Sequence, residues 1–149
     1  MEAHFVHFSC DFDNLKEAMS LWKSYGVTGR DIFVLGVIGV FFRIGESNPV
    51  LQKLFNKFNQ LKEPGNKAII NNININDLIP KNTEYYTYDG SLTTPPCTPI
   101  VKWHVIAEPI TVSEEQLNKL RTLLNPQHGY EGPNYRPLQT NSNPVYGCI

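Results

Sequence analysis

The sequence predicts a β-dominated α+β fold, and three observations support this. Residues 2–8 alternate polar and apolar side chains, and residues 33–44 are rich in Val, Ile and Phe, as buried strands are. The helical patterns are short and lie between the strand-like segments. The chain has 149 residues, which is the length of one domain large enough to bury a core. We therefore expect a single domain over residues 1–149.

The first half of the chain alternates strands and helices. After the strand at 2–8, Asn14 starts a short helix, since Glu17 follows three residues later as in a capping box. A strand is expected over residues 33–44, broken at Gly36 and Gly39. Ser47 and Pro49 then open the clearest helix, whose apolar positions recur at i, i+3, i+4 and i+7. These positions are Leu51, Leu54, Phe55 and Phe58.

The second half begins with an Asn-rich stretch, residues 71–80, which we interpret as a short strand or loop because it ends in a proline. Residues 100–106 form a strand. Ser113 with Gln116 caps a helix that runs to Leu124. Residues 125–139, dominated by Gly and Pro, form an extended, turn-rich tail.

Composition narrows the class of function. Hydrophobic residues make up 41% and charged residues 18% of the chain, as in ordinary soluble globular proteins. The net charge of -1 argues against nucleic acid as a partner. The first residues lack the pattern of a signal peptide, and the most apolar stretch, Ile32–Ile44, is too short for a membrane segment. The three cysteines, Cys10, Cys97 and Cys148, form no C-x-x-C pair, which argues against a zinc ribbon.

The strand at 2–8 presents an imidazole beside a carboxylate. Side chains two residues apart on a strand share a face, so Glu2, His4 and Val6 point one way and His7 the other. His4 is either a hydrogen-bonded core histidine or a metal ligand. Glu2 on the same face favours the ligand, because a metal-bound histidine usually donates its second N–H to such an acceptor.

The strand at 100–106 divides in the same way. Val101 and Trp103 share one face, and Lys102 and His104 share the other. If these elements meet, five apolar residues line one wall of a pocket: Val6, Val37, Leu92, Val101 and Trp103. The alternative is that they are simply core, and spacing does not separate the two interpretations.

Four segments resemble, in order, the signatures of the alpha-class carbonic anhydrases. They are "EAHFVHF", "YYTYDGSLTTPP", "VKWHVIAEPITVSEEQLNKLR" and "NYRPLQ", and the resemblance covers essentially the whole chain. It implies a twisted, mostly antiparallel central sheet with short peripheral helices. It also implies a zinc-dependent lyase that hydrates carbon dioxide reversibly to bicarbonate.

The resemblance implies roles for individual residues. His4 resembles the third zinc ligand, and Glu2 its carboxylate partner. Thr93 resembles the hydroxyl that orients the attacking oxygen, and Thr94 its neighbour, which contacts bicarbonate. The five apolar residues named above match the wall that holds carbon dioxide. Tyr88 matches a buried tyrosine of the hydrogen-bond network, and Arg136 resembles a structural residue.

The sequence also departs from the family pattern. No H-x-H pair, the family's first two zinc ligands, occurs among His4, His7, His104 and His128. The upstream glutamate and the proton-shuttling histidine are absent too, and Asn143 stands where the family tends to carry an arginine. The chain therefore resembles an N-terminally truncated domain, and we expect it alone not to hold zinc, since catalytic zinc needs three protein ligands.

The cysteine after "TTPP" bears on the compartment of the protein from which the chain derives. In secreted family members a cysteine at the position of Cys97 pairs with one near the N-terminus, so the resemblance implies an extracellular parent. The alternative is a small buried apolar cysteine. The compartment of this chain stays unknown.

Two hypotheses follow for function. In the first, the chain is part of a carbonic anhydrase in which the named residues keep their family roles. In the second, it is a catalytically inactive, carbonic-anhydrase-related binding or interaction module. The strand at 2–8, interior in the complete family domain, is expected to expose its outer edge and to permit self-association when the upstream part is missing. A genuine stand-alone module would instead have covered this edge.

Overall fold

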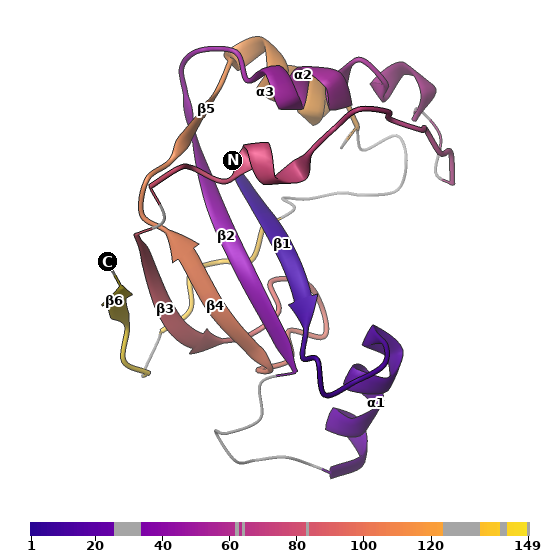
Figure 1. Cartoon of the computed structure of the whole chain (residues 1–149). Helices are drawn as coiled ribbons and strands as arrows, with labels where there is room; N and C mark the ends of the chain where they lie inside the picture. Colours follow the sequence, from indigo (N-terminus) through magenta and orange to yellow (C-terminus); the bar gives the residue numbers. More distant parts are fainter. Residues whose placement is uncertain are drawn as a thin grey trace. The chain divides into compact units, whose positions relative to one another are not determined.

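The computed structural model describes residues 1–25, 34–61, 63, 65–82, 84–123, 135–140 and 143–148, with backbone alone for 21–25. These residues form two compact units. The first comprises Met1–Glu2, Val40–Asn82 and Glu108–Asn134, and the second Ala3–Gly39, Thr83–Ala107 and Tyr135–Ile149. The fold is dominated by one open six-stranded sheet with few short helices, as the sequence predicts (Figure 1).

The described strands and helices follow one another along the chain in this order: β1 (Glu2–Phe8), α1 (Leu15–Tyr25), β2 (Leu35–Ile44), α2 (Pro49–Phe55), β3 (Tyr85–Gly90), β4 (Val101–Ile106), β5 (Ile110–Val112), α3 (Glu114–Leu123) and β6 (Tyr146–Cys148). Two 3-10 turns, η1 (Phe58–Gln60) and η2 (Ile75–Leu78), lie between α2 and β3. The expected strands at 2–8 and 100–106 are thereby confirmed, the second starting one residue later. Residue 33 and Leu124, expected ends of a strand and a helix, lie outside the described residues.

The sheet has the strand order β1-β2-β4-β3-β6, and β5 pairs with the far end of β2. The ladders β3–β4 and β3–β6 are antiparallel, whereas β2 runs parallel to β4 and to β5. In β4, Trp103 lies opposite Val37 of β2 on one side and Tyr88 of β3 on the other. These registers place Val37, Trp103 and Tyr88 on the same face of the sheet.

β1 forms one end of this strand order. The N–H of Ser9 donates to the carbonyl of Val34, and the N–H of Phe42 donates to that of Met1. Residue numbers therefore rise along β1 as they fall along β2, which makes the pair antiparallel. Among the described strands none pairs with the outer side of β1, so the exposed edge expected from the sequence is present.

β2 continues through both of its glycines, and the expected breaks at Gly36 and Gly39 are wrong. Both residues lie in register with β4, opposite Lys102 and Val105. A strand that is paired on both sides keeps its ladder, because the hydrogen bonds come from the backbone and do not depend on side chains.

The helix caps were predicted well at two of three sites. The Asn14 side chain accepts the N–H of Glu17 at 3.0 Å, as expected. Ser113 and Gln116 make the reciprocal capping box, each side chain accepting the other's N–H at 3.2 Å. At α2, however, Asn48 and not Ser47 is the cap, and its side chain accepts from Val50 and Leu51. Asn caps at least as well as Ser, so composition alone did not decide between neighbours.

The segment 71–80 contains a 3-10 turn rather than a strand. The Asn74 side chain accepts the N–H of Asn76 at 3.1 Å and caps η2. Asparagine favours such local hydrogen bonds over a sheet ladder, which explains the departure. Phe58, expected as the last apolar position of the helix at 49, lies in η1, since α2 ends at Phe55.

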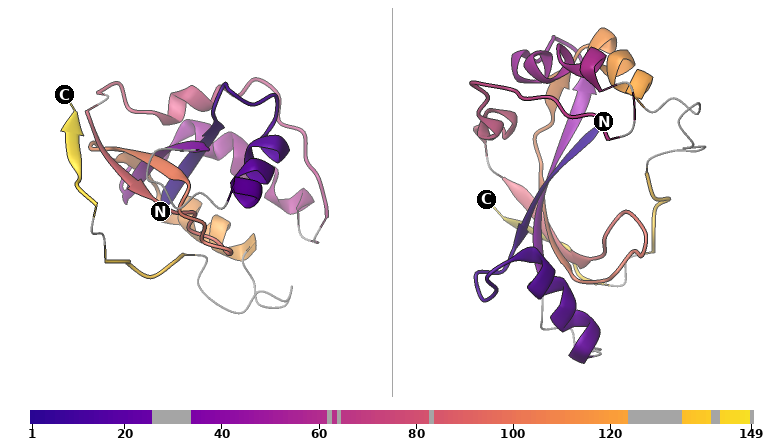
Figure 2. Two further views of the ribbon diagram at one scale, coloured as in Figure 1. Left: turned by 90° about the horizontal axis from the view of Figure 1, so that it is seen from below. Right: turned by 90° about the vertical axis from the view of Figure 1, so that its right-hand side faces the viewer.

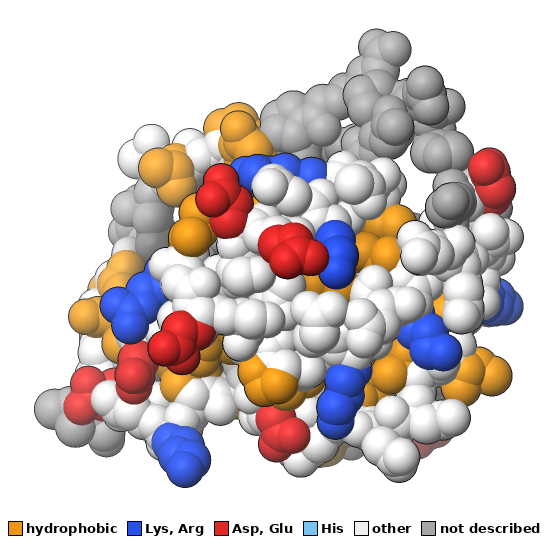
Figure 3. Space-filling view, turned by 90° about the horizontal axis from the view of Figure 1, so that it is seen from above, with side chains coloured by type: hydrophobic (Ala, Val, Ile, Leu, Met, Phe, Trp, Pro, Cys, Tyr) orange, Lys and Arg blue, Asp and Glu red, His pale blue; other side chains and the backbone are white. Residues whose placement is uncertain are grey.

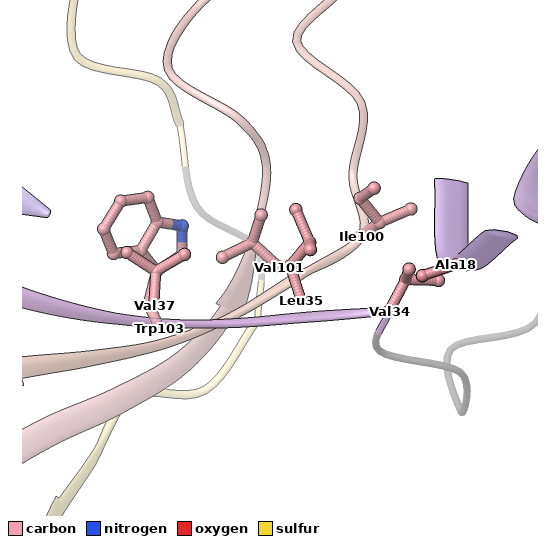
Figure 4. Close-up of a cluster of buried hydrophobic side chains, with 7 residues drawn as sticks. All are labelled: Ala18, Val34, Leu35, Val37, Ile100, Val101 and Trp103. Atoms are coloured by element: carbon pink, nitrogen blue, oxygen red, sulfur yellow. The ribbon is translucent and has the colours of Figure 1, made fainter. Parts of the chain in front are cut away.

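The core of the second unit is one cluster on a single face of the sheet. Figure 4 shows Val37 beside Trp103 on one side of the strands, and Ala18 of α1 next to Val34. The seven members of the cluster are Ala18, Val34, Leu35, Val37, Ile100, Val101 and Trp103. Phe12, Met19, Tyr88, Leu92 and Val105 pack against them. This cluster attaches α1 and the start of β4 to β2.

The first unit is held together by α2 and α3, which lie side by side (Figures 1 and 2). Gln116 at the start of α3 is only 1% exposed, and its side chain carries four hydrogen bonds. Two of them join it to the N–H and carbonyl of Asn48, the cap of α2, at 2.9 and 2.8 Å. One glutamine therefore connects the beginnings of both helices.

Acidic and basic side chains are interspersed on the face seen in Figure 3. Neither sign forms a block among the coloured atoms there, in keeping with the net charge of -1. None of the helices in the described part of the chain is long and apolar enough to cross a membrane.

Candidate functional site

His4 lies against Trp103. β1 and β4 carry the two rings, whose centroids are 4.8 Å apart with an interplanar angle of 71°, so the rings meet edge to face. Trp103 is only 4% exposed, whereas His4 is exposed to solvent. The imidazole therefore has an apolar indole on one side and access to water.

Four of the five apolar candidates come together. Val37, Val101 and Trp103 belong to the core cluster, and Leu92 packs against it. Val6 is not part of this core, since its side chain is 55% exposed. The four residues therefore lie together as core, and their role as the wall of a pocket stays a prediction.

The threonines lie in the loop that joins β3 to β4, which projects from the end of these strands (Figure 2). Thr93 and Thr94 are exposed. The loop is closed by three backbone hydrogen bonds: Leu92 N–H to Thr98 carbonyl at 2.9 Å, Cys97 N–H to Thr94 carbonyl at 2.9 Å, and Ile100 N–H to Thr98 carbonyl at 3.0 Å. The peptide bond between Pro95 and Pro96 is cis, and Cys97 has a positive φ of 56°.

Ser91 connects this loop to the indole and to the C-terminal segment. Its carbonyl accepts the Trp103 Nε1–H at 3.1 Å. Its hydroxyl accepts from Nη1 of Arg136 and donates to the carbonyl of Leu92. The C-terminal segment is held a second time where Asn143 donates to the carbonyl of Asp89 at 3.1 Å.

Gly90 lets the indole lie against β3. A Cβ at this position would come within 2.8 Å of Trp103 Cδ1 and within 3.1 Å of Tyr88 Cε2. The rings of Tyr88 and Trp103 are nearly parallel, with an interplanar angle of 13° and centroids 6.3 Å apart. The backbone of Gly90 therefore occupies a space in which a side chain would displace an aromatic ring.

The opposite face of the same strands is polar. Lys102 and Asp89 form an ion pair at 2.7 Å, both side chains about one-third exposed. Burial and then the neighbouring Lys102 charge lower the pKa of His104, against a backbone hydrogen bond that raises it. A hydrogen bond with the Cys148 side chain, followed by its charge and by burial, raises the pKa of Tyr85. His104 and Tyr85 are in ring contact, with centroids 5.3 Å apart.

The described residues do not fit a zinc ion. No group of three His, Cys, Asp or Glu side chains within the described ranges is placed to hold a metal. His7 turns its Nδ1 to the carbonyl of Phe5 at 3.1 Å, and His104 lies on the opposite face from Trp103. His4 is thus the one histidine on the Trp103 face within those ranges, and one imidazole is too few for a catalytic zinc site.

Two comparisons with known proteins identify the family of the chain. The family model of the eukaryotic-type carbonic anhydrases matches residues 1–146. The chain belongs to this family. Carbonic anhydrase 3 of Bos taurus is 36% identical over 153 aligned residues, which cover 99% of this chain and 53% of the bovine protein. The chain thus spans about half the length of that curated relative, and the family to which it belongs is zinc-dependent.

Sequence reasoning missed several residues that support the site. Ser91 and Gly90 were given no role of their own, and residues 85–90 were not predicted as a strand, although β3 pairs with β4 along its whole length. The aromatic run "YYTY" followed by Asp-Gly was the available signal, since aromatic residues favour strands and Asp-Gly favours turns. β5 and β6, of three residues each, are too short to leave a periodic pattern.

Proposed function

We propose that the protein to which these residues belong catalyses the reversible hydration of carbon dioxide to bicarbonate. The observation that carries this proposal is the edge-to-face contact of His4 with Trp103, an indole that shares a buried cluster with Val37 and Val101. A histidine next to an apolar wall places a polar group beside a surface that an uncharged substrate can contact.

Each side chain has a separate role in this proposal. Val37, Leu92, Val101 and Trp103 offer a surface that an uncharged molecule such as carbon dioxide can touch without losing hydrogen bonds to water. The exposed Thr93 hydroxyl can accept a hydrogen bond from an attacking oxygen and aim its lone pair at the substrate carbon. Thr94 contacts the bicarbonate product, and Val6 extends the wall at its exposed side.

In the proposed site His4 would be one ligand of the metal, and Glu2, two residues earlier on the same strand, would be its carboxylate partner. A zinc ion held there would act as a Lewis acid. The 149-residue sequence has no H-x-H pair to complete the ligand set. Both compact units count as parts of one carbonic anhydrase domain in this proposal, because the family match runs through both.

A second function is favoured by one observation: the described residues hold no three-ligand metal site. In this alternative the chain is a catalytically inactive, carbonic-anhydrase-related module that binds a partner. The two functions differ in what they require of the chain. The enzyme requires two further metal ligands, whereas the inactive module gives the threonine loop no role.

A chimera separates the two functions. The chain is joined to the parts of bovine carbonic anhydrase 3 that it does not match. For the enzyme proposal we expect about one zinc per chain by elemental analysis and measurable hydration of carbon dioxide, whereas the 149 residues alone hold no stoichiometric zinc. A chimera that binds zinc without hydrating carbon dioxide supports the inactive module, and tight zinc in the chain alone contradicts our assignment of the ligands.

Three variants of the chimera test the residue roles. His4→Gln should lose zinc, whereas His7→Gln, on the opposite face of the same strand, should retain it. Thr93→Ala should keep zinc and lose about 100-fold in turnover, the scale for one oriented hydrogen bond at a reacting centre. Equal zinc loss in Thr93→Ala would show that this threonine is misassigned.

A further inference from the structure

We propose that Arg136 is a positioning residue of the candidate site: through Ser91 it holds the Trp103 indole against His4. The proposed function is needed only to give the indole its use as a wall. The positional claim stands on hydrogen bonds and packing in the second unit, and its test does not measure activity.

The first step is the indole itself. Trp103 is 4% exposed, and its ring has a single polar group, the Nε1–H, which a buried indole usually satisfies. That group donates to the carbonyl of Ser91 at 3.1 Å. The direction of the indole ring is therefore tied to the position of the Ser91 backbone.

The second step is what holds Ser91. This residue comes directly after β3, where the β3–β4 ladder has ended at Gly90 and Val101. Beyond the ladder, its hydroxyl accepts from Nη1 of the half-buried Arg136. A charge-assisted hydrogen bond of this kind is stronger than a neutral one, so the guanidinium is the natural anchor.

The third step is the orientation of Arg136. Its Nη2 donates to Oε1 of Gln139 at 2.9 Å, and the Gln139 amide donates to the carbonyl of Pro137 at 2.7 Å. The guanidinium is thus held by its own segment on one side while it grips Ser91 on the other. Because its fork is planar and rigid, two such bonds fix its direction.

The consequence reaches His4 and the threonine loop together. Trp103 meets His4 edge to face at 4.8 Å, so a shift of the indole changes the surface beside the imidazole. Ser91 also precedes Leu92 and Thr93, and its hydroxyl donates to the Leu92 carbonyl at 3.1 Å. One guanidinium therefore sets both the wall and the start of the loop.

The test uses the 149-residue chain with Trp22→Phe, which leaves Trp103 as the only indole. Fluorescence quenching by acrylamide measures how often the Trp103 ring is reached from water. Arg136→Ala should raise the quenching constant about threefold and shift the emission to longer wavelength, because the released segment opens locally. Ser91→Ala, which removes the hydroxyl but keeps the carbonyl, should have the same effect.

Controls make the result specific. Asn143→Ala removes the hydrogen bond from this side chain to the carbonyl of Asp89 in β3 and should leave Trp103 quenching unchanged. Arg121→Ala removes an exposed arginine of α3 with a similar local bond and should also change nothing. Arg136→Lys, which keeps a charged donor, should restore part of the protection.

The two substitutions should also fail to add. Because Arg136 and Ser91 act through one hydrogen bond, the double variant should be quenched no more than either single variant. Unchanged quenching in Arg136→Ala, additive effects in the double variant, or an equal effect of Asn143→Ala would overturn the proposal. If Arg136→Ala does not fold, judged by circular dichroism, Ser91→Ala and Arg136→Lys decide the question by the same measurement.

Discussion

The position of Trp103 depends on a neighbour without a side chain. The indole lies across the backbone of Gly90, at a distance that no Cβ tolerates, and its Nε1–H reaches the next residue, Ser91. The Trp103 ring is therefore held by close packing on Gly90 and by a hydrogen bond to Ser91, both at the end of β3. At this scale, the position of the indole is set by Gly90 and Ser91.

Gly90→Ala should destabilise the chain by about 1–3 kcal/mol, because the added methyl group overpacks the Trp103 and Tyr88 rings. The matched control is Gly36→Ala on β2, where a Cβ would meet nothing within 4 Å. That variant should be neutral or slightly stabilising. Urea unfolding of both variants measures the difference, and equal stabilities would show that the contact at Gly90 relaxes without cost.

His104 gives the chain a dependence on pH. Since burial and then the Lys102 charge lower its pKa from the ordinary value of 6.5, the unfolded chain binds the proton more readily than the folded chain. Stability is therefore unaffected at alkaline pH and is lost as pH falls through about 6.5. His104→Gln should reduce the loss of unfolding free energy between about pH 8 and about pH 5.

The control for this titration is His7→Gln on the exposed β1. It keeps the number of histidines equal in the two variants, so that only the position differs. If both variants lose stability to the same extent on acidification, His104 is not the group responsible.

Among the elements, the pair α2–α3 shows how a cap can become a long-range link. The capping box of α3 was predictable, because Ser113 and Gln116 have the required spacing. The same Gln116 side chain also bonds the backbone of Asn48 and the side chain of Gln52, 68 and 64 residues away. A buried polar group is favourable only when it is fully satisfied, and here it is.

Gln116→Leu should destabilise the chain by about 3 kcal/mol, since it leaves half-buried backbone groups of Asn48 and Ser113 without their partner. Gln60→Leu, the same change at an exposed position of η1, should stay within about 0.5 kcal/mol of the parent. Chemical unfolding followed by far-UV circular dichroism compares the two. A neutral Gln116→Leu would mean that water replaces the lost amide.

For the whole chain, the sheet edge at β1 decides behaviour in solution. No described strand pairs with its outer side, and Val6 and Phe8 beside it are 55% and 41% exposed. An unpaired edge with apolar side chains invites pairing with another chain. We therefore expect the 149 residues alone to self-associate or to be poorly soluble.

Sedimentation of the purified chain over a range of concentrations tests this expectation. Val6→Lys should weaken the association, because an edge charge opposes strand pairing. Val145→Lys, at a residue that is 54% exposed near β6, is the matched control and should have little effect. A monodisperse monomer that unfolds cooperatively at high concentration would contradict the expectation.

Much of the fold could be predicted because local signals agree with it. Alternation gave β1, the β-branched run gave β2, and paired Ser and Gln gave the cap of α3. The errors arise where a local signal is overruled by a distant segment. The predicted breaks in β2 are wrong because β4, far along the chain, pairs with both glycines and keeps them in the strand.

In the candidate site, too, local features were predictable from the sequence and long-range contacts were not. The sequence by itself determined the family, through motifs that are each a short continuous segment, and it placed Val101 with Trp103 and His4 with Val6 on shared strand faces by simple alternation. Only the tertiary structure decided that Val6 stays exposed while Leu92 joins the core, and that Ser91 connects Arg136 to Trp103. The reason is physical: alternation follows from backbone geometry within a few residues, whereas burial and hydrogen-bond partners depend on which distant segments fold against each other.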